Sequence, residues 1–309
     1  MKEKTPLISL LILTYNRAHL LARTIDSVLN QSFQNFEIIL INNGSEDHTK
    51  KIIEEYQANE KFRIFHLEKN IGFAKGFNFG LEQISGEWFA FLGDDDVIDG
   101  KAFETLLQVL TEVSPDINAI NCNGIDSATG RLSGTGLDRD QYLPIDVIVE
   151  KTGGNFWGIT KNELIGDIRL NEKIPGLEDT FWYQIDAIAN RYYIHKKLII
   201  YYTDHGKTET SRQSTIAMKS KMYEELLHEP FFWDVLRKYN QKQYLTRCLK
   251  GMCYLKLIGK NKGVQTYRRM AGMVDLRLKE RILVNIFISF PPPFLEKLHQ
   301  IYKALSPSW

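Results

Sequence analysis

Three consecutive aspartates at 94–96 follow the apolar run 88–92 and Gly93, where a buried strand should reach its carboxyl end. Hard divalent cations such as Mg²⁺ and Mn²⁺ prefer oxygen ligands, and carboxylates this close repel one another unless a cation or a proton relieves them. The triplet therefore indicates a metal site. The alternative is an acidic turn that caps a helix starting near Lys101, because Asp is also common in turns and at helix N-termini.

The segments around the triplet alternate between apolar runs of strand length and helical spacing of apolar residues. The runs are 7–13, 36–41, 62–67 and 88–92, and the helical patterns are 20–29, 50–56 and 73–84. Strands buried on both faces that alternate with helices predict an α/β, Rossmann-like, mainly parallel sheet. Ligands bind beyond the carboxyl ends of such strands. The polar turns 14–17, 42–45 and 70–72 should therefore share one sheet edge with the triplet.

The second half of the chain has a weaker pattern. Further strands are predicted at 117–122 and 194–201, and from Ile216 the spacing is helical up to the prolines 291–293, with a last helix at 294–305. We therefore predict a catalytic domain at 1–215 and a helical C-terminal region at 216–309.

Composition is that of an ordinary globular protein: 309 residues, 43% hydrophobic and 25% charged, enough to bury a sizeable core. No run approaches the roughly 20 apolar residues that cross a bilayer, and the first residues carry no signal-peptide pattern, so a cytoplasmic protein is expected. The cysteines Cys122, Cys248 and Cys253 are too few for a disulfide framework or a zinc site and are interpreted as core residues.

Charge is unevenly distributed although the net charge is only +1. Residues 237–281 hold 13 Lys or Arg and 2 Asp or Glu, directly before the apolar segment 282–290. A peripheral association with an anionic membrane surface on the inner face of the cytoplasmic membrane fits this pattern. Packing on the catalytic domain or homo-oligomerisation through the same apolar content is the alternative. Nothing matches a nucleic-acid reading module, so no nucleic-acid partner is expected.

The order of several short motifs resembles the family 2 glycosyltransferases with the GT-A fold, many of which use nucleotide-sugar donors to build bacterial surface polysaccharides. The resemblance covers about the first two thirds of the chain. Its motifs are 9–17, 42–49, 70–72, 86–88, the acid triplet and the pair Glu178-Asp179.

For Thr14, Tyr15 and Arg17 the resemblance implies a nucleotide pocket, in which an aromatic ring can stack on a base while Arg meets phosphate. A polar turn that starts a helix is the alternative. Asn42 stands where the family usually has an acid. Its carbonyl can still accept a hydrogen bond from a pyrimidine N–H. The departure bears on the identity of the base, so a UDP-sugar is favoured only weakly over a dTDP-sugar.

The third motif departs further, because Gly76-Phe77-Asn78 stands where the family has Ala-Arg-Asn. Beside the predicted donor residue Gly72, Lys75 is the candidate to supply the missing charge toward the diphosphate, although Lys lacks the bidentate geometry of Arg. The alternative is a solvated helix lysine.

The family's metal motif begins with Asp where this chain has Gly93. The resemblance makes Asp95 the direct ligand of Mn²⁺ or Mg²⁺, with Asp96 as a second ligand or orienting neighbour and Asp94 toward the sugar or ribose. His205 matches a position near metal or diphosphate, against the alternative of an exposed loop histidine. The cation would neutralise charge on the leaving nucleoside diphosphate.

The resemblance also makes Asp179 the general base of an inverting reaction, with Glu178 orienting the acceptor or holding Asp179. Helix capping is the alternative for both acids. The glycine-rich stretch 153–158 is similar to an acceptor loop, in which Asn155 and Trp157 would meet a sugar. A core tryptophan is the competing interpretation.

The sequence thus predicts an inverting, metal-dependent glycosyltransferase that moves a sugar from a nucleoside-diphosphate sugar to a glycan or lipid-linked saccharide. Two rivals remain. A sugar-nucleotide pyrophosphorylase would also bind nucleotide and metal but has no need of the 178–179 acids. A noncatalytic nucleotide- or sugar-binding scaffold would explain the departures from the family motifs.

Overall fold

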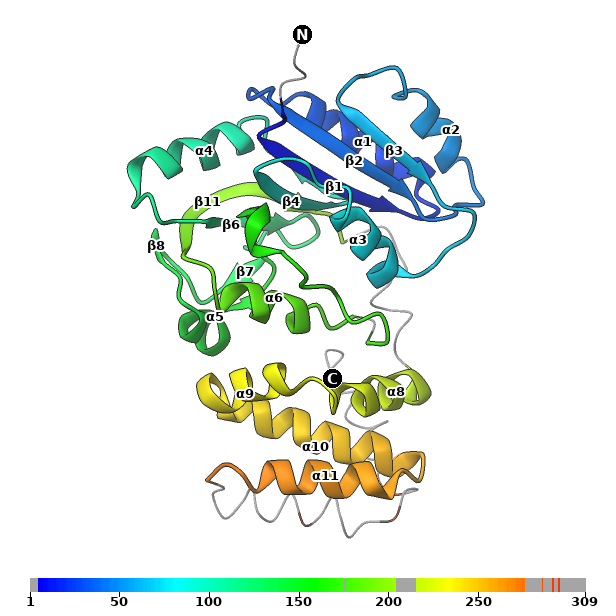
Figure 1. Cartoon of the computed structure of the whole chain (residues 1–309), viewed down its shortest axis with the longest axis vertical. Helices are drawn as coiled ribbons and strands as arrows, with labels where there is room; N and C mark the ends of the chain where they lie inside the picture. Colours follow the sequence, from blue (N-terminus) through cyan, green and yellow to red (C-terminus); the bar gives the residue numbers. More distant parts are fainter. Residues whose placement is uncertain are drawn as a thin grey trace. The chain divides into compact units, whose positions relative to one another are not determined.

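The computed structural model describes residues 5–174, 176–203 and 215–275, together with Asn285, Pro291 and Phe294. The chain forms two compact units (Figure 1). We call residues 1–172 and 181–206 the α/β unit, and residues 173–180 and 207–309 the helical unit. The predicted division at 215/216 has a single boundary. In the structure, the short segment 173–180 also groups with the helical unit.

The α/β unit is built on one large sheet with the strand order β3-β2-β1-β4-β10-β6-β11-β5, and β8 pairs with β11. The strands are β1 Ile8–Thr14, β2 Phe36–Asn42, β3 Phe62–His66, β4 Trp88–Gly93, β5 Val97–Ile98, β6 Ala119–Asp126, β8 Gln141–Tyr142, β10 Trp157–Lys161 and β11 Arg191–Tyr201. A small second sheet pairs β7 Gly134–Thr135 with β9 Gly153–Gly154.

The helices of this unit connect the strands. They are α1 Ala18–Leu29, α2 Thr49–Glu54, α3 Phe73–Leu81, α4 Ala102–Glu112, α5 Ile145–Lys151, the 3₁₀ turn Asn162–Leu164 and α6 Asp179–Asp186, whose first two residues belong to the helical unit. The predicted alternation of strand and helix in the first hundred residues is confirmed. The strands predicted at 117–122 and 194–201 are also present, as the longer β6 and β11.

Strand β1 shows why its apolar run forms the centre of the sheet. All seven of its residues are buried, and it pairs in parallel with β2 on one side and β4 on the other. Its alternate residues Ile8, Leu10 and Ile12 enter the core cluster that includes residues of α1 and α4. Leu11 and Leu13 enter the other cluster, with residues of α3 and α6. This two-sided burial accounts for a run with no polar alternation.

Beyond β4 the sheet becomes mixed. Strand β10 runs antiparallel to both β4 and β6, and β6 pairs in parallel with β11. The sheet is therefore mainly parallel at its β3–β4 side and mixed on the other side, with helices flanking it as predicted.

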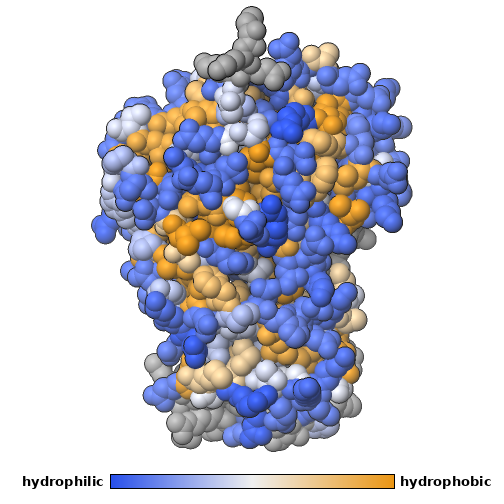
Figure 2. Space-filling view, in the orientation of Figure 1, coloured by the Kyte–Doolittle hydropathy of each residue, from blue (hydrophilic) through white to orange (hydrophobic). Residues whose placement is uncertain are grey.

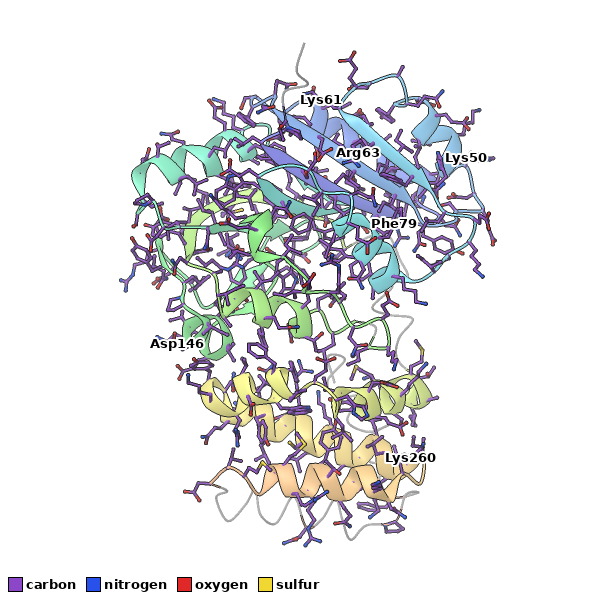
Figure 3. The ribbon with its side chains drawn as sticks, in the orientation of Figure 1. Lys50, Lys61, Arg63, Phe79, Asp146 and Lys260 are labelled. Carbon is purple, nitrogen blue, oxygen red and sulfur yellow. The ribbon has the colours of Figure 1, made fainter. Side chains whose placement is uncertain are left out.

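Two polar residues interrupt the apolar strands and are satisfied internally. Ser9 on β1 donates a hydrogen bond to the buried Glu37 carboxylate on β2, and Ser85 donates another to the same carboxylate at 2.7 Å. Arg63, labelled on β3 in Figure 3, forms an ion pair with Glu37 at 3.3 Å. A buried carboxylate is tolerated where it is paired and hydrogen-bonded in this way.

The helical unit contains α8 Ile216–Leu226, α9 Pro230–Tyr239, α10 Gln241–Leu257 and α11 Asn261–Ala271. Aromatic rings fill its centre: Tyr223 stacks on Tyr254 with ring centroids 5.4 Å apart, and Trp233 meets Tyr267 at 5.6 Å. Cys248 and Cys253 are buried free thiols on α10, as Cys122 is on β6, which confirms their interpretation as core residues. Lys260, labelled between α10 and α11 in Figure 3, forms an ion pair with Glu224 at 3.0 Å.

Among the described residues, no helix is both long enough and apolar enough to span a bilayer. The visible face of the molecule is a mosaic of hydrophilic and hydrophobic residues (Figure 2). The apolar segment 282–290, apart from Asn285, and the predicted helix 294–305, apart from Phe294, lie outside the described residues.

Candidate active site

The acid triplet forms a turn between β4, which ends at Gly93, and β5, which begins at Val97. The side chain of Asp94 is 14% exposed, and Asp96 is buried. Burial and the neighbouring charge of Asp95 raise the pKa of Asp94 and of Asp96 to about 7 each. Burial and a like charge both oppose the ionisation of these two carboxyl groups. A divalent cation beside them would offset this cost, because an opposite charge favours the ionised form.

Three basic or backbone groups hold this turn in place. Arg17 lies 3.7 Å from the Asp94 carboxylate, and the guanidinium of Arg23 donates a hydrogen bond of 2.8 Å to the Asp95 carbonyl. The backbone N–H of Tyr202 donates to Asp96 Oδ1 at 3.1 Å, while the Tyr202 ring lies 3.5 Å below the Arg23 guanidinium. The sequence analysis missed Arg23 and Tyr202, because their contacts cross 72 and 106 residues of chain.

Gly93 stands where the family motif has its first acid, and steric crowding explains why this chain has glycine there. A Cβ atom at this position would lie 2.6 Å from Asp96 Oδ2 and 3.1 Å from Asp95 Oδ1. The Asp96 carboxylate cannot simply retreat, because its other oxygen is held by the Tyr202 amide. A side chain at position 93 would therefore collide with the Asp96 carboxylate, and this explains why glycine stands there in place of the first acid.

We predict that Gly93→Ala displaces the Asp96 carboxylate and lowers Mn²⁺-dependent nucleotide affinity by about 10-fold to 100-fold, the usual effect of disturbing the support of a metal site. Calorimetric titration with UDP and Mn²⁺ measures this. Gly100→Ala is the matched control, since its Cβ would only reach ordinary contact with the Asn30 carbonyl at 3.5 Å. Equal affinities in the two variants would contradict the prediction.

The residues present fit a hard cation whose coordination shell is completed by ligands from the substrate. Among the described residues, no three His, Cys, Asp or Glu side chains converge to form a full protein-only metal site. Mg²⁺ and Mn²⁺ are commonly held by one or two carboxylates with the remaining ligands from substrate phosphates and water. The Asp95 and Asp96 carboxylates suit that role. His205, the third predicted ligand, lies outside the described residues.

The turn after β1 carries the predicted nucleotide-binding residues. Asn16 has a positive φ of 54°, and its side-chain carbonyl accepts a hydrogen bond from the Glu46 amide at 2.8 Å. The buried Thr14 hydroxyl makes no full hydrogen bond within the described residues, although it lies close enough to lower the pKa of Asp94. Tyr15 and Arg17 are half-buried. The turn thus brings Thr14, Tyr15 and Arg17 to the edge that carries the acid triplet.

Asn42 and Asn43 are buried and serve the turn itself. Asn42 Oδ1 accepts from the Ser45 amide at 3.0 Å, and its Nδ2 lies 3.2 Å from His66 Nδ1. Asn43 accepts from the Ile71 amide at 3.0 Å, which fastens the loop that includes Gly72. The predicted contact of Asn42 with a base would have to use the second lone pair of a carbonyl that already accepts one bond.

Two further donor candidates, Gly72 at the N-terminus of α3 and Lys75 in the first turn of that helix, differ in their surroundings. Gly72 has a φ of 87° and open space where a Cβ would stand, so it is accessible to a ligand. Lys75 is 52% exposed and lies 3.8 Å from Glu172, which agrees with a solvated helix lysine. A diphosphate contact by Lys75 stays a prediction.

Trp157 is a core residue, so the prediction that it stacks on an acceptor sugar is wrong. Its side chain stacks on Phe103 with centroids 6.2 Å apart, its Nε1–H donates to the Phe91 carbonyl at 2.8 Å, and the residue is 5% exposed. The sequence could not separate the two interpretations, because a Trp after glycines suits both. Asn155 is exposed beside β9 and β10 and stays an acceptor candidate.

We predict that Trp157→Phe lowers the free energy of unfolding by about 1–2 kcal/mol, through one lost hydrogen bond and a small cavity, and leaves turnover unchanged. Urea denaturation and donor turnover measure the two quantities. Unchanged stability with impaired turnover would restore Trp157 to the acceptor site.

The predicted base lies in the helical unit. Asp179 is the first residue of α6, and its Oδ2 accepts a hydrogen bond from Arg247 on α10 at 3.1 Å. Desolvation raises the pKa of Asp179, while Arg247 acts in the opposite direction. Desolvation and the charge of Asp179 also raise the pKa of Glu178. Both acids are half-buried, and Arg247 is a third charged member that sequence reasoning missed because it lies 68 residues away.

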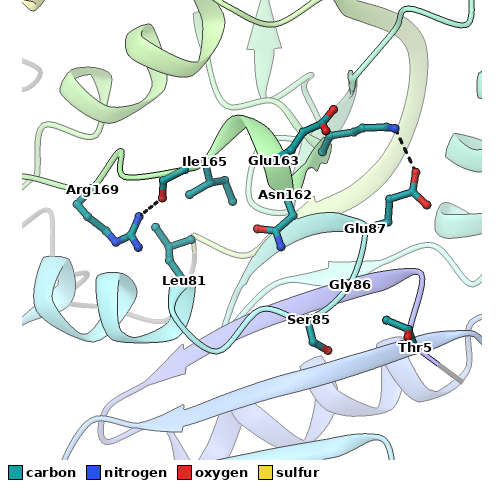
Figure 4. Close-up of a pocket in the computed structure, with 11 residues that line it drawn as sticks. Thr5, Leu81, Ser85, Gly86, Glu87, Asn162, Glu163, Ile165 and Arg169 are labelled. Carbon is teal, nitrogen blue, oxygen red and sulfur yellow. Dashed lines mark hydrogen bonds and ion pairs between the residues drawn. The ribbon is translucent and has the colours of Figure 1, made fainter. Parts of the chain in front are cut away.

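A cavity of about 530 Å³ in the α/β unit has none of the predicted site residues in its lining. It opens at the amino ends of β1 and β4, where Lys161 pairs with Glu87 at 3.2 Å and Arg169 donates to the Gly166 carbonyl (Figure 4). Ligands of parallel α/β sheets bind at the carboxyl ends of the strands. The acid turn at that opposite edge is therefore the better candidate for the donor site.

A mixed, mainly parallel sheet flanked by helices is the GT-A fold, and the solved structure of S. aureus TarS 1–349 in complex with UDP is similar in fold. Residues 9–182, more than half of the chain, match the model of glycosyl transferase family 2, and the chain belongs to this family. It is therefore a glycosyltransferase, as the sequence predicts.

Relatives match over very different lengths. The chain is 29% identical over 310 residues to the GalNAc(5)-diNAcBac-PP-undecaprenol beta-1,3-glucosyltransferase of Campylobacter jejuni, covering 97% of this chain and 99% of the relative. It is 24% identical to the glycosyltransferase GlyG of Streptococcus pneumoniae, over 64% of this chain and 69% of that protein.

Solved structures support the fold alone. S. aureus TarS residues 1–349 in complex with UDP-GlcNAc superpose with a TM-score of 0.60 at 16% identity, covering 86% of this chain and 90% of TarS 1–349. The mannosyltransferase PcManGT of Pyrobaculum calidifontis, in complex with GDP-Man and Mn²⁺, has a TM-score of 0.53 at 13% identity, with coverage of 99% and 89%.

Proposed function

We propose that this glycosyltransferase is metal-dependent and inverting, and that it transfers a sugar from a nucleoside-diphosphate sugar to a hydroxyl of a lipid-linked saccharide. The observation that carries the proposal is the buried acid turn at the carboxyl edge of the sheet, in a chain of family 2. A noncatalytic scaffold would not need two carboxyl groups whose charge is opposed by burial.

The α/β unit supplies donor binding in this proposal. Asp95 and Asp96 would hold Mn²⁺ or Mg²⁺, and such a cation offsets the negative charge of a diphosphate. Arg17, 3.7 Å from Asp94, favours the ionised form of that carboxyl and so opposes the rise in its pKa, and Asp94 would meet a ribose or sugar hydroxyl. Tyr15 would meet the base. We favour a UDP-sugar, because UDP and UDP-GlcNAc are bound by the TarS neighbours.

Asp179 supplies the base. It accepts the proton of the acceptor hydroxyl while that oxygen bonds to the anomeric carbon and the nucleoside diphosphate departs with the bonding electron pair. Attack on the face opposite the leaving group inverts the anomeric centre. Glu178, whose pKa is also raised, is suited to hold the acceptor.

Calorimetric titration of the full chain with UDP, dTDP and GDP and their sugars, with Mn²⁺ and then with a chelator, tests the donor class. We expect metal-dependent binding of one pyrimidine diphosphate. An absence of binding across the panel would favour the scaffold, and pyrophosphate release from a sugar nucleotide would favour the pyrophosphorylase.

The lipid-linked acceptor is inferred from the Campylobacter jejuni relative, whose name specifies an undecaprenol-linked saccharide. Exposed Lys262, Arg268 and Arg269 on α11 can attract the helical unit to an anionic membrane surface. We therefore predict that the chain floats with vesicles containing 30% phosphatidylglycerol and less with phosphatidylcholine alone, and that R268Q/R269Q weakens flotation. Equal flotation of both proteins on both vesicles would contradict a role for these charges.

A further inference from the structure

Two contacts within the helical unit hold Arg247. Its Nη2 donates to Asp179 Oδ2 at 3.1 Å, and its guanidinium lies 5.2 Å from the centre of the Phe232 ring. The Tyr223 hydroxyl is close enough for the charge of Arg247 to lower its pKa, against the larger effect of burial. Only 17% of the side chain is exposed. A guanidinium held on several sides presents its N–H groups in one direction, because its fork is planar and rigid.

The two oxygens of the Asp179 carboxylate differ as a result. Oδ2 is held by Arg247, whereas no donor from the described residues reaches Oδ1. The side chain is 43% exposed, so that Oδ1 is accessible. A general base needs this division, because one oxygen must be fixed while the other meets the substrate proton within hydrogen-bond reach.

We propose that Arg247 is a positioning residue for the transfer reaction, which holds Asp179 through Oδ2 so that Oδ1 takes the acceptor proton. This inference rests on the proposed role of Asp179 as the base. Arg247 touches neither donor nor acceptor in this proposal. It acts through the orientation and the ionisation of the carboxylate.

The effect of Arg247 on the pKa of Asp179 has a definite direction. Desolvation favours the neutral carboxyl, and the Arg247 cation favours the carboxylate, so loss of Arg247 must raise the pKa of Asp179. The charge of Asp179 in turn adds to the desolvation that raises the pKa of the neighbouring Glu178. Tyr223 has a raised pKa and stays neutral, while Lys250, beside Arg247, has a pKa lowered to about 8.

The first test needs no substrate. Carboxyl-¹³C aspartate labelling of the full chain follows the titration of Asp179, assigned by the signal lost in Asp179→Asn. We expect Arg247→Gln to raise this pKa by about one unit, the lower end of the effect of a paired Arg, and Arg247→Lys to raise it less. Arg237→Gln is the matched control, because Arg237 pairs with the exposed Asp234. An unmoved pKa in Arg247→Gln would overturn the inference.

The second test is the pH profile of UDP release from the sugar nucleotide that binds best, with Mn²⁺ and water as the acceptor. The base must be ionised, so the acidic limb of the kcat profile should move to higher pH by about one unit in Arg247→Gln. At pH values below the pKa of the base, kcat should then be about 10-fold lower than in the parent protein, and the donor KM should be unchanged. Arg247→Lys should recover part of the rate. A uniform fall of kcat without a shifted limb would mean a structural role.

The outcomes separate the two proposals. If Asp179→Asn retains full turnover, the assignment of the base fails whatever Arg247 does. If Asp179→Asn is inactive and both Arg247 variants keep the normal pKa and limb, the positioning role alone fails. Melting temperatures of all variants identify any loss of folding.

Discussion

Replacing Asp179 by Asn is expected to lower kcat by about 10²-fold to 10⁴-fold and to leave donor affinity unchanged. The amide has nearly the shape of the carboxylate and its Oδ1 can still accept a hydrogen bond from Arg247, so the helical unit should keep its structure. The amide cannot take a proton, however, and the acceptor hydroxyl then remains a weak nucleophile. Nucleoside diphosphate release and calorimetric donor titration measure the two quantities.

The exposed Asp146 on α5, labelled in Figure 3, provides the matched control, since Asp146→Asn makes the same chemical change away from the site. Donor affinity that falls in Asp179→Asn as far as turnover does would show that Asp179 belongs to donor binding instead. Full turnover would remove it from the mechanism.

Replacing Asp95 by Ala is expected to abolish the metal-dependent part of donor binding. We expect affinity for the best nucleoside diphosphate with Mn²⁺ to fall by about 100-fold or more, which corresponds to about 2.7 kcal/mol. Ligand binding stabilises the folded state by mass action, so the rise in melting temperature with Mn²⁺ and UDP should also disappear. Loss of a carboxylate between Asp94 and Asp96 relieves like-charge repulsion, and the free enzyme should therefore stay folded.

Two comparisons make this result specific. Asp138→Ala, an exposed acid of the same unit, should behave as the parent protein. In the presence of chelator, the parent protein and Asp95→Ala should bind the nucleotide with equal weakness. A loss of affinity in Asp95→Ala that persists with chelator would mean that Asp95 contacts the donor directly.

Local pattern was sufficient to predict the strand framework of the α/β unit. Buried strands such as β1 and β2 are apolar on both faces, and this property is written in consecutive residues. The position of the acid triplet at a strand end is equally local. The antiparallel β10, by contrast, enters between β4 and β6, and no periodicity in 157–161 indicates those partners.

The sequence by itself determined which residues stand at the carboxyl ends of the strands, because strand length and turn residues are properties of neighbouring positions. Only the tertiary structure decided which side chains are available there. It placed Trp157 in the core, where its indole meets Phe103, and it paired Asp179 with Arg247 across 68 residues. Partners so distant depend on the order of the strands and on helix packing, which short motifs do not encode.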